Sequence, residues 1–434
     1  MNRARTIGAA HFLSVMAGLA ACLPGLALAQ AASATPDASA PASAVVTPAP
    51  PRQPRFGLWE HVTLKDGDPV PPDPLNLFGG RLRPILLFRG LLVQTFEDRY
   101  TVPQGNGKPD LVLDSSKMDP SQFGHRRGFV LDSVEVGLQG RFDSGFHYLA
   151  RAEMIPREKD GNRSSDYLKD AYFGWNRYAW LDVRVGRMKV PFSQENLKPT
   201  AKQALIYSPV VDVLTSKRQV GLLVSGGDPW EVARLSAGVF NSTGLAVEQM
   251  KVFSQMLYVA RLDLRIDRLL KALKVRAGDL EVNLGTNVAW VKQNYDPPTE
   301  HRWVGVDAHV HFWRFTTEAE FVLKDFFDPA AAGGVRKADR GWGWYTDLTF
   351  QAWPGVIDVT GRVEEMDGDR VVRGSGSGLS IDEMALQKKR WITAGVSLYL
   401  SRQARLDIDY VHRTALEGYN FKNDVVMGMF QFDL

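Results

Sequence analysis

The sequence predicts an all-β fold, an antiparallel transmembrane barrel of about sixteen strands with short turns on one rim and long loops on the other. Three observations lead to this prediction. Apolar and charged residues alternate over stretches as long as the roughly 9 to 11 tilted residues that cross a bilayer. The connections between these stretches alternate between short and long. The last stretch of alternation runs to the final residue, Leu434.

The start of the chain has the features of a secretory signal peptide. Arg3 and Arg5 precede an apolar stretch, and Ala27-Leu28-Ala29 forms a small-residue cleavage site. An alternative is a lipoprotein signal, in which Cys22 would carry a lipid. The conventional cleavage site fits better because the apolar stretch continues past Cys22. Both interpretations predict export from the cytoplasm.

The expected organisation is a signal peptide over residues 1–29, a leader over 30–80 and a transmembrane barrel over 81–434. The leader is rich in Ala, Pro, Ser and Thr, so we expect a disordered periplasmic segment. Cys22 is the only cysteine, and its removal with the signal peptide would exclude disulfides, thiolate metal sites and cysteine catalysis. The net charge is +3 without a long basic run, which gives no indication of nucleic-acid binding.

The alternation places several charges on one face of each predicted strand. Between residues 255 and 267, even positions are apolar and odd positions hold Arg261, Asp263, Arg265 and Asp267. Residues 144–154, 314–324 and 404–413 repeat the pattern. Successive side chains on a strand point to opposite faces. Strands of this length with one apolar and one charged face fit lipid outside and a wet lumen inside.

The predicted strands begin near residues 83, 128, 144, 165, 181, 217, 231, 254, 277, 302, 314, 340, 356, 389, 404 and 423. Short turns include Asp143-Ser144-Gly145 and Pro354-Gly355, whereas residues 98–127, 190–216, 326–339 and 367–388 form long connections. An even number of strands with this alternation places both ends of the barrel in the periplasm and the long loops outside the cell. The location predicted is therefore the outer membrane of a Gram-negative-type bacterium.

Three stretches resemble the phosphate-selective porin O and P family. They are GFVLDSVEVGLQGRFDSGFHYLARAE at 128–153, LKDAYFGW followed by VRVGRMKVPFSQE within 168–195, and the segments 218–221 and 237–241. The resemblance implies a sixteen-stranded barrel, commonly a homotrimer, with loops folded into the pore. It also implies passive diffusion of small hydrophilic solutes, with anions such as phosphate among them, and neither catalysis nor a cofactor.

The long connection 190–216 is expected to bend inward and narrow the pore. A constriction rich in cations would concentrate anions. The alternative is that these are surface cations on an external loop, beside the acids Glu195 and Asp212. The candidate constriction residues are Arg187, Lys189, Lys198, Lys202, Lys217 and Arg218.

A second set of arginines is predicted to face the lumen. These candidate pore-lining residues are Arg184, Arg234, Arg261 and Arg265. They would form a basic ladder, or they would pair with Asp182, Asp263 and Glu281 across the strands; the sequence favours pairing. Acids slightly outnumber bases on the predicted inward faces, so the wall is mixed rather than a simple anion filter.

Other interpretations of the sequence remain open. Asp307, His309 and His311 lie on one strand face, but residues two apart sit roughly 6.5 Å apart, which is wide for a shared metal. No nucleophile motif accompanies them, which disfavours an outer-membrane enzyme. Tryptophans near strand ends indicate interfacial girdles rather than a sugar-binding slide. A plugged structural or adhesin barrel is the remaining alternative. The tryptophans concerned are Trp175, Trp180, Trp290, Trp303, Trp342, Trp344 and Trp353.

Overall fold

A computed structural model describes the barrel and the segment inserted in it. The described residues are 81–95, 99–102, 111–114, 128–142, 144–155, 158–159, 162–163, 167–178, 180–228, 230–241, 256–273, 278–293, 299–328, 337–367, 388–415 and 424–434. The predicted signal peptide and leader lie outside these residues. No helix in the described ranges is long and apolar enough to cross a membrane.

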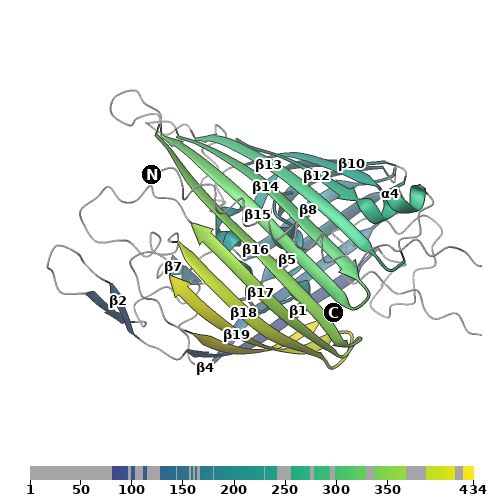
Figure 1. Ribbon diagram of the computed structural model, residues 1–434. Coiled ribbons are helices and arrows are strands. Elements are labelled where there is room, and N and C mark those ends of the chain that lie inside the picture. The colour runs from purple at the N-terminus through teal and green to yellow at the C-terminus, as the bar shows by residue number, and fades with distance from the viewer. Residues whose placement is uncertain are drawn as a thin grey trace, which may run out of the picture. The chain divides into compact units, whose positions relative to one another are not determined.

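Sixteen antiparallel strands close into one barrel, as the sequence predicts (Figure 1). Each pairs with its neighbour in the chain, and β1 closes the barrel against both β4 and β20. The barrel strands are β1 (Arg83–Thr95), β4 (Gly128–Arg141), β5 (Phe146–Glu153), β8 (Leu168–Trp175), β9 (Leu181–Lys189), β10 (Arg218–Gly227), β11 (Ala233–Asn241), β12 (Met256–Arg265), β13 (Glu281–Gln293), β14 (Thr299–Phe312), β15 (Phe315–Asp328), β16 (Lys337–Trp353), β17 (Ile357–Asp367), β18 (Lys389–Tyr399), β19 (Ala404–Ala415) and β20 (Val425–Asp433).

Strand β10 illustrates the two faces of the wall. Val220, Leu222 and Val224 are exposed on the outside, whereas Gln219 and Ser225 are buried on the inside. The same alternation on the other strands produces an apolar outer surface and a polar inner one. Such a surface is stable when the outside meets lipid, and closure leaves no unpaired strand edge in the hydrocarbon.

Short turns connect the strands on one rim. Gly145 and Gly355 adopt φ values of 86° and 80°, which side chains disfavour. A Cβ on Gly145 would also overlap the backbone of Arg177 in the next turn. Glycine is therefore required at this rim both for the turn and for close packing of neighbouring turns.

The structure corrects two details of the prediction. The alternation through Asp267 predicts a strand, but β12 ends at Arg265 and helix α4 (Ile266–Ala272) follows. Residues 266–272 are mostly good helix formers, so local propensity ends the strand at the rim. Two long connections also contain small hairpins. These are β2 (Arg99–Val102) with β3 (Leu111–Asp114), and β6 (Glu158–Lys159) with β7 (Asn162–Arg163).

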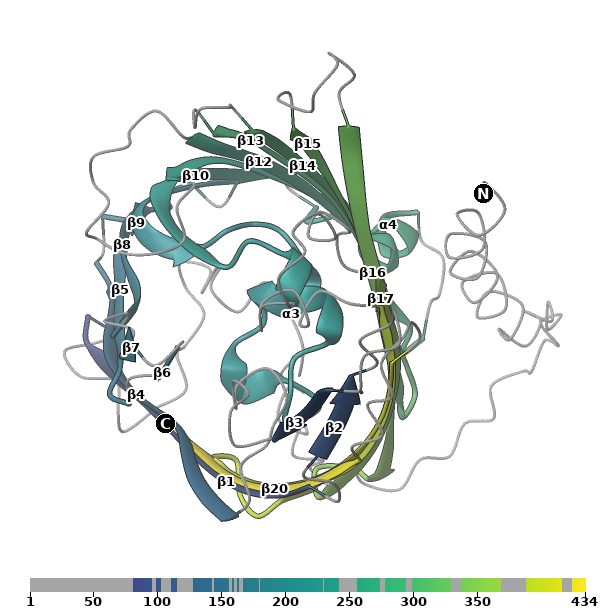
Figure 2. The same cartoon turned by 90° about the vertical axis from the view of Figure 1, so that its left-hand side faces the viewer.

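Residues 190–217 between β9 and β10 form an inserted segment that lies inside the barrel (Figure 2). It contains helix α3 (Gln194–Leu197) and the 3-10 turns η3 (Thr200–Lys202) and η4 (Val210–Leu214). The prediction that this connection bends inward matches its position.

The inserted segment is anchored by two apolar clusters. One joins Phe192 and Val211 of the segment to strands β9 through β17. The other joins Ile206 to β1, β19 and β20. Strands β4 and β8 contribute to these clusters only through the partly buried Val130 and Tyr172. The apolar contacts of the segment therefore extend around most of the lumen wall, and strands β4, β5 and β8 contribute least to them.

Candidate pore lining and constriction

Carboxylates of the wall accept hydrogen bonds from backbone N–H groups of the inserted segment. Asp409 accepts from the amide of Ile206 (2.7 Å), and Glu364 accepts from the amide of Val210 (2.6 Å). All four groups are buried, where an unpaired amide would be costly. These carboxylates therefore hold the path of the segment rather than facing solutes.

The wall also supplies donors to the carbonyl groups of the segment. They come from strands β1, β14, β17, β19 and β20, at distances of 2.8 to 3.0 Å. Each bond gives a hydrogen-bond partner to a backbone carbonyl group that has none within a helix or strand ladder. The bonds run from Arg89 to Ile206, Trp303 to Leu214, Arg362 to Tyr207, Arg405 to Gln203 and Gln431 to Ala201.

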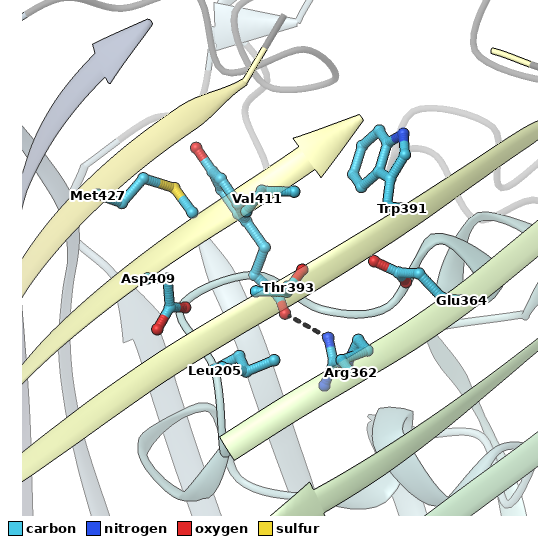
Figure 3. A pocket seen from close by; sticks show the side chains of 9 residues that line it. Leu205, Arg362, Glu364, Trp391, Thr393, Asp409, Val411 and Met427 are labelled. Carbon is cyan, nitrogen blue, oxygen red and sulfur yellow. Dashed lines mark hydrogen bonds between the residues drawn. The ribbon is translucent and has the colours of Figure 1, made fainter. Parts of the chain in front are cut away.

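A small pocket remains between the segment and strands β17 to β20 (Figure 3). Arg362 and Glu364 lie at one side of it, and both are already bound to the segment backbone. The pocket therefore belongs to the anchoring contact. Its lining residues are Leu205, Tyr207, Arg362, Glu364, Trp391, Thr393, Asp409, Val411 and Met427.

Helix α3 begins at a tight cap against strand β15, two strands along the barrel from β17. Ser193 has φ 70°, accepts from the amide of Asn196 (3.2 Å) and donates to Glu320 (3.0 Å). The same carboxylate accepts from the amide of Glu195 (3.4 Å). A short capping side chain thus fixes the point where the segment turns into the lumen.

Lys198, a predicted constriction residue, lies in a buried acidic pair. Its ammonium contacts Glu195 (2.7 Å) and Glu318. Burial by itself lowers the pKa of Lys198, but the two carboxylates outweigh it and raise the pKa above the usual range. The charge of Lys198 is therefore neutralised within the anchoring contact.

We expect Lys198→Met to destabilise the barrel by about 2 kcal/mol, because Glu195 and Glu318 would lose their shared cation. The reversal potential of the pore should stay unchanged. Urea unfolding and salt-gradient recordings test this together. A large loss of anion preference with unaltered stability would show instead that Lys198 faces the solutes.

Of the other predicted constriction cations, Lys189 and Lys217 flank the segment, and Lys202 lies in η3 within it. Lys189 donates to the carbonyl of Lys198, and exposed Lys217 contacts Asp212 (3.0 Å). Burial lowers the pKa of Lys202, which neighbours Asp433. The structure thus distributes these cations among local partners.

Two more candidates lie where strands β9 and β10 pair. Arg187 pairs in register with exposed Val220, on the outward-facing set of β9, and donates to the carbonyl of Lys169 (3.2 Å). Arg218 contacts Asp170 (2.9 Å) on the lumen side. Only Arg218 of this pair thus contacts a group of the inner wall.

The predicted pore-lining arginines divide into two groups. Arg261 is 1% exposed and lies between Asp263 (2.7 Å) and Asp307 (2.7 Å). Arg265 contacts Asp267 at 3.7 Å. The pairing that the sequence favours is therefore present for Arg261, with Asp307 as an additional partner.

Arg184 and Arg234 converge on one buried acid. Arg184 contacts Asp182 at 2.6 Å, and Arg234 approaches it to 3.7 Å. Arg184 also lies 5.2 Å from the ring centre of Tyr172, a cation–π contact. Two guanidinium groups thus share a single carboxylate and a ring on the lumen wall.

A second group of bases continues this wall toward the long-loop end. Arg151 contacts Glu135 (3.1 Å) and Asp170. Lys169 contacts Glu135 (2.5 Å) and Glu153 (2.7 Å). Arg218 shares Asp170 with Arg151. Asp170 and Tyr172 lie two apart on β8, which joins the two groups.

We name the basic wall as Arg151, Lys169, Arg184, Arg218 and Arg234. Their side chains are 12–17% exposed. The acids beneath them are at most 4% exposed. The groups that meet the lumen are therefore mostly cationic although the charges are nearly balanced. These acids are Glu135, Glu153, Asp170 and Asp182.

Arg151 and Lys169 are not among the constriction or pore-lining residues that the sequence predicts. Both lie within the stretches that carry the family resemblance, and Arg151 lies on the charged face of an alternating stretch. Alternation identifies a lumen side chain but not its depth relative to a neighbouring acid. The difference in exposure between bases and acids therefore needs the structure.

The residues considered for a metal or hydrolase site, Asp307, His309 and His311, all contact other side chains of the barrel. Asp307 binds Arg261, while His309 contacts Glu318 (3.0 Å) and His311 contacts Thr316 (2.9 Å). Within the described ranges no cluster of residues suited to a metal is found. Trp303 is an exception to the girdle interpretation, because it faces inward and binds the inserted segment.

The closed barrel, apolar outside and charged inside around an inserted segment, has the architecture of an outer-membrane porin. A family model described as phosphate-selective porin O and P matches residues 114–262. This confirms the resemblance over that range. The match and the fold together identify an outer-membrane porin for small solutes and point to a channel rather than an enzyme.

One solved structure supports the same fold. The outer membrane channel DcaP of Acinetobacter baumannii is 12% identical, covers 81% of this chain and 97% of its own, and gives a TM-score of 0.52. An anion-selective porin from Comamonas acidovorans is 14% identical, with 82% and 100% covered and a TM-score of 0.49. A search of curated proteins gave no match.

Proposed function

We propose that this porin lets small hydrophilic solutes diffuse passively and favours small anions, with phosphate among them. The observation that carries the preference is the basic wall, whose cations reach the lumen while their acids lie beneath. Cations lining a narrow aqueous passage raise the local concentration of anions. The inserted segment would narrow this passage from the opposite side and set its width. We also propose a homotrimer, as the family resemblance implies.

Planar-bilayer recording of the purified, folded chain tests the pore itself. We expect stepwise conductance that scales with salt concentration. A correctly folded barrel that gives no steps would contradict the proposal and favour the plugged structural barrel.

We expect Arg184→Gln combined with Arg234→Gln to shift the reversal potential in a salt gradient toward cations. The change removes two lumen cations but leaves Asp182, so the anion-to-cation permeability ratio should fall by roughly two- to fivefold. The matched control is Arg302→Gln with Arg340→Gln, which removes two arginines from the outer surface. An equal shift in both double variants would contradict a role for the basic wall.

A further inference from the structure

A second charged surface lies on the outside of the barrel, at the long-loop ends of β14 to β18. Arg302, Asp325 and Arg340 are paired in register across β14, β15 and β16. They belong to the outward-facing set, because Val304 and Val306 on the same face of β14 are exposed. On β17 and β18, Glu365 and Arg390 are paired in the same way. The charges therefore form a band around the outside of this rim.

The bases of this band project beyond its acids. Arg340 contacts Asp325 (2.6 Å), and its side chain is 61% exposed against 20% for the acid. Arg302 contacts Glu300 (2.6 Å) with 54% against 20%. Each exposed guanidinium is thus oriented by a more deeply placed carboxylate.

The band continues along the rim with the same order of depth. Arg390 and Lys388 share Glu365, at 2.7 Å and 3.9 Å, and the carboxylate is the least exposed of the three. Asp367, at the end of β17, is partly buried. We name the outer rim patch as Arg302, Arg340, Lys388 and Arg390 with Glu300, Asp325, Glu365 and Asp367.

Directly below the patch, the same strands present an exposed apolar surface. The patch therefore lies where the hydrocarbon band ends, on the rim that faces out of the cell. Ionised side chains at this height meet lipid headgroups rather than bulk water alone. The apolar residues are Val304, Val306, Leu348, Val363 and Ile392.

We propose that the outer rim patch binds the phosphorylated headgroup of an outer-leaflet glycolipid. Arg302 and Arg340 are two strands apart, roughly 10 Å, so two phosphates of one headgroup would each meet one guanidinium. Guanidinium groups bind phosphate through paired hydrogen bonds. The acyl chains would lie along the apolar surface below. The bases of the patch are more exposed than its acids, and these outward guanidinium groups together with the adjoining apolar surface select this glycolipid.

Binding of diphosphorylated lipid A to the full, detergent-folded chain tests the proposal, measured by native mass spectrometry. The dephosphorylated lipid is the comparison ligand. We expect Arg302→Gln with Arg340→Gln to weaken binding of the phosphorylated form by roughly tenfold. The matched control is Arg268→Gln with Arg314→Gln on the short-turn rim, which should bind as the unmodified chain does.

Folding is checked by heat-dependent gel mobility and by unchanged single-channel conductance. If Arg302→Gln with Arg340→Gln fails to fold, Arg302→Lys with Arg340→Lys keeps the charge without the paired donors and should weaken binding less. Equal affinity for both lipid forms, or binding unaffected by loss of both arginines in a folded barrel, would overturn the proposal.

Discussion

Replacing residues 191–216 with Asn-Gly is expected to raise single-channel conductance severalfold. Val190 and Lys217 are already joined by a hydrogen bond of 2.9 Å from the amide of Val190, so a two-residue turn can connect β9 to β10. A sixteen-stranded barrel without the inserted segment encloses a wide aqueous lumen. The deletion should also weaken anion preference, since Glu364 and Asp409 would lose their amide partners and face water.

The control places the same Asn-Gly turn at Ser401–Gln403, on the opposite rim and outside the lumen. That variant should conduct as the unmodified chain does. An unchanged conductance in a folded deletion variant would contradict the position of the inserted segment as the element that narrows the pore.

Arg261→Met is expected to destabilise the barrel by about 3–5 kcal/mol, because it leaves buried carboxylates without their cation. The guanidinium makes two bonds to Asp307, of 2.7 and 2.8 Å, and contacts Asp263. These bonds cross β13 at Gly285, where a Cβ would overlap both partners. Urea unfolding of the folded barrel in lipid measures the loss.

A double-mutant cycle separates the interaction energy of Arg261 and Asp307 from the loss of packing that each substitution causes. Asp307→Asn together with Arg261→Met should be less destabilising than the sum of the single changes, since neither leaves the other buried and unpaired. Gly285→Ala should destabilise through overlap while both charges remain. Additive effects of Arg261→Met and Asp307→Asn would contradict a coupled pair at this position.

Most of the barrel follows from the sequence. All sixteen strands were predictable because alternation is a local property that a lipid-facing wall imposes on every strand. The predicted start of β13 near residue 277 differs from Glu281 because α4 and a turn occupy the preceding rim. Helix α4 is too short to give a periodic pattern, so the alternation predicted a continuing strand there instead.

The candidate site was predictable in part. Alternation places Arg184, Arg234 and Arg261 on the inner wall. It does not distinguish an arginine whose side chain is fully buried from one whose side chain reaches the water of the lumen. Asp307 determines that difference for Arg261, and the two residues are far apart in the sequence. Lys198 likewise meets Glu318 only because the segment folds inward. Such long-range partners have no local pattern in the chain.

Cysteine modification during bilayer recording tests most directly whether water passes along the basic wall. Cys22 is the only cysteine in the sequence, so its replacement by serine gives a clean background. Arg184→Cys introduces a lumen thiol, and Val185→Cys places one on the exposed outer face of the same strand. We predict that an anionic methanethiosulfonate lowers the current through the Arg184→Cys channel and leaves Val185→Cys unchanged. If the cysteine at position 184 is not modified, or if its modification leaves the current unchanged, a passage along this wall is contradicted.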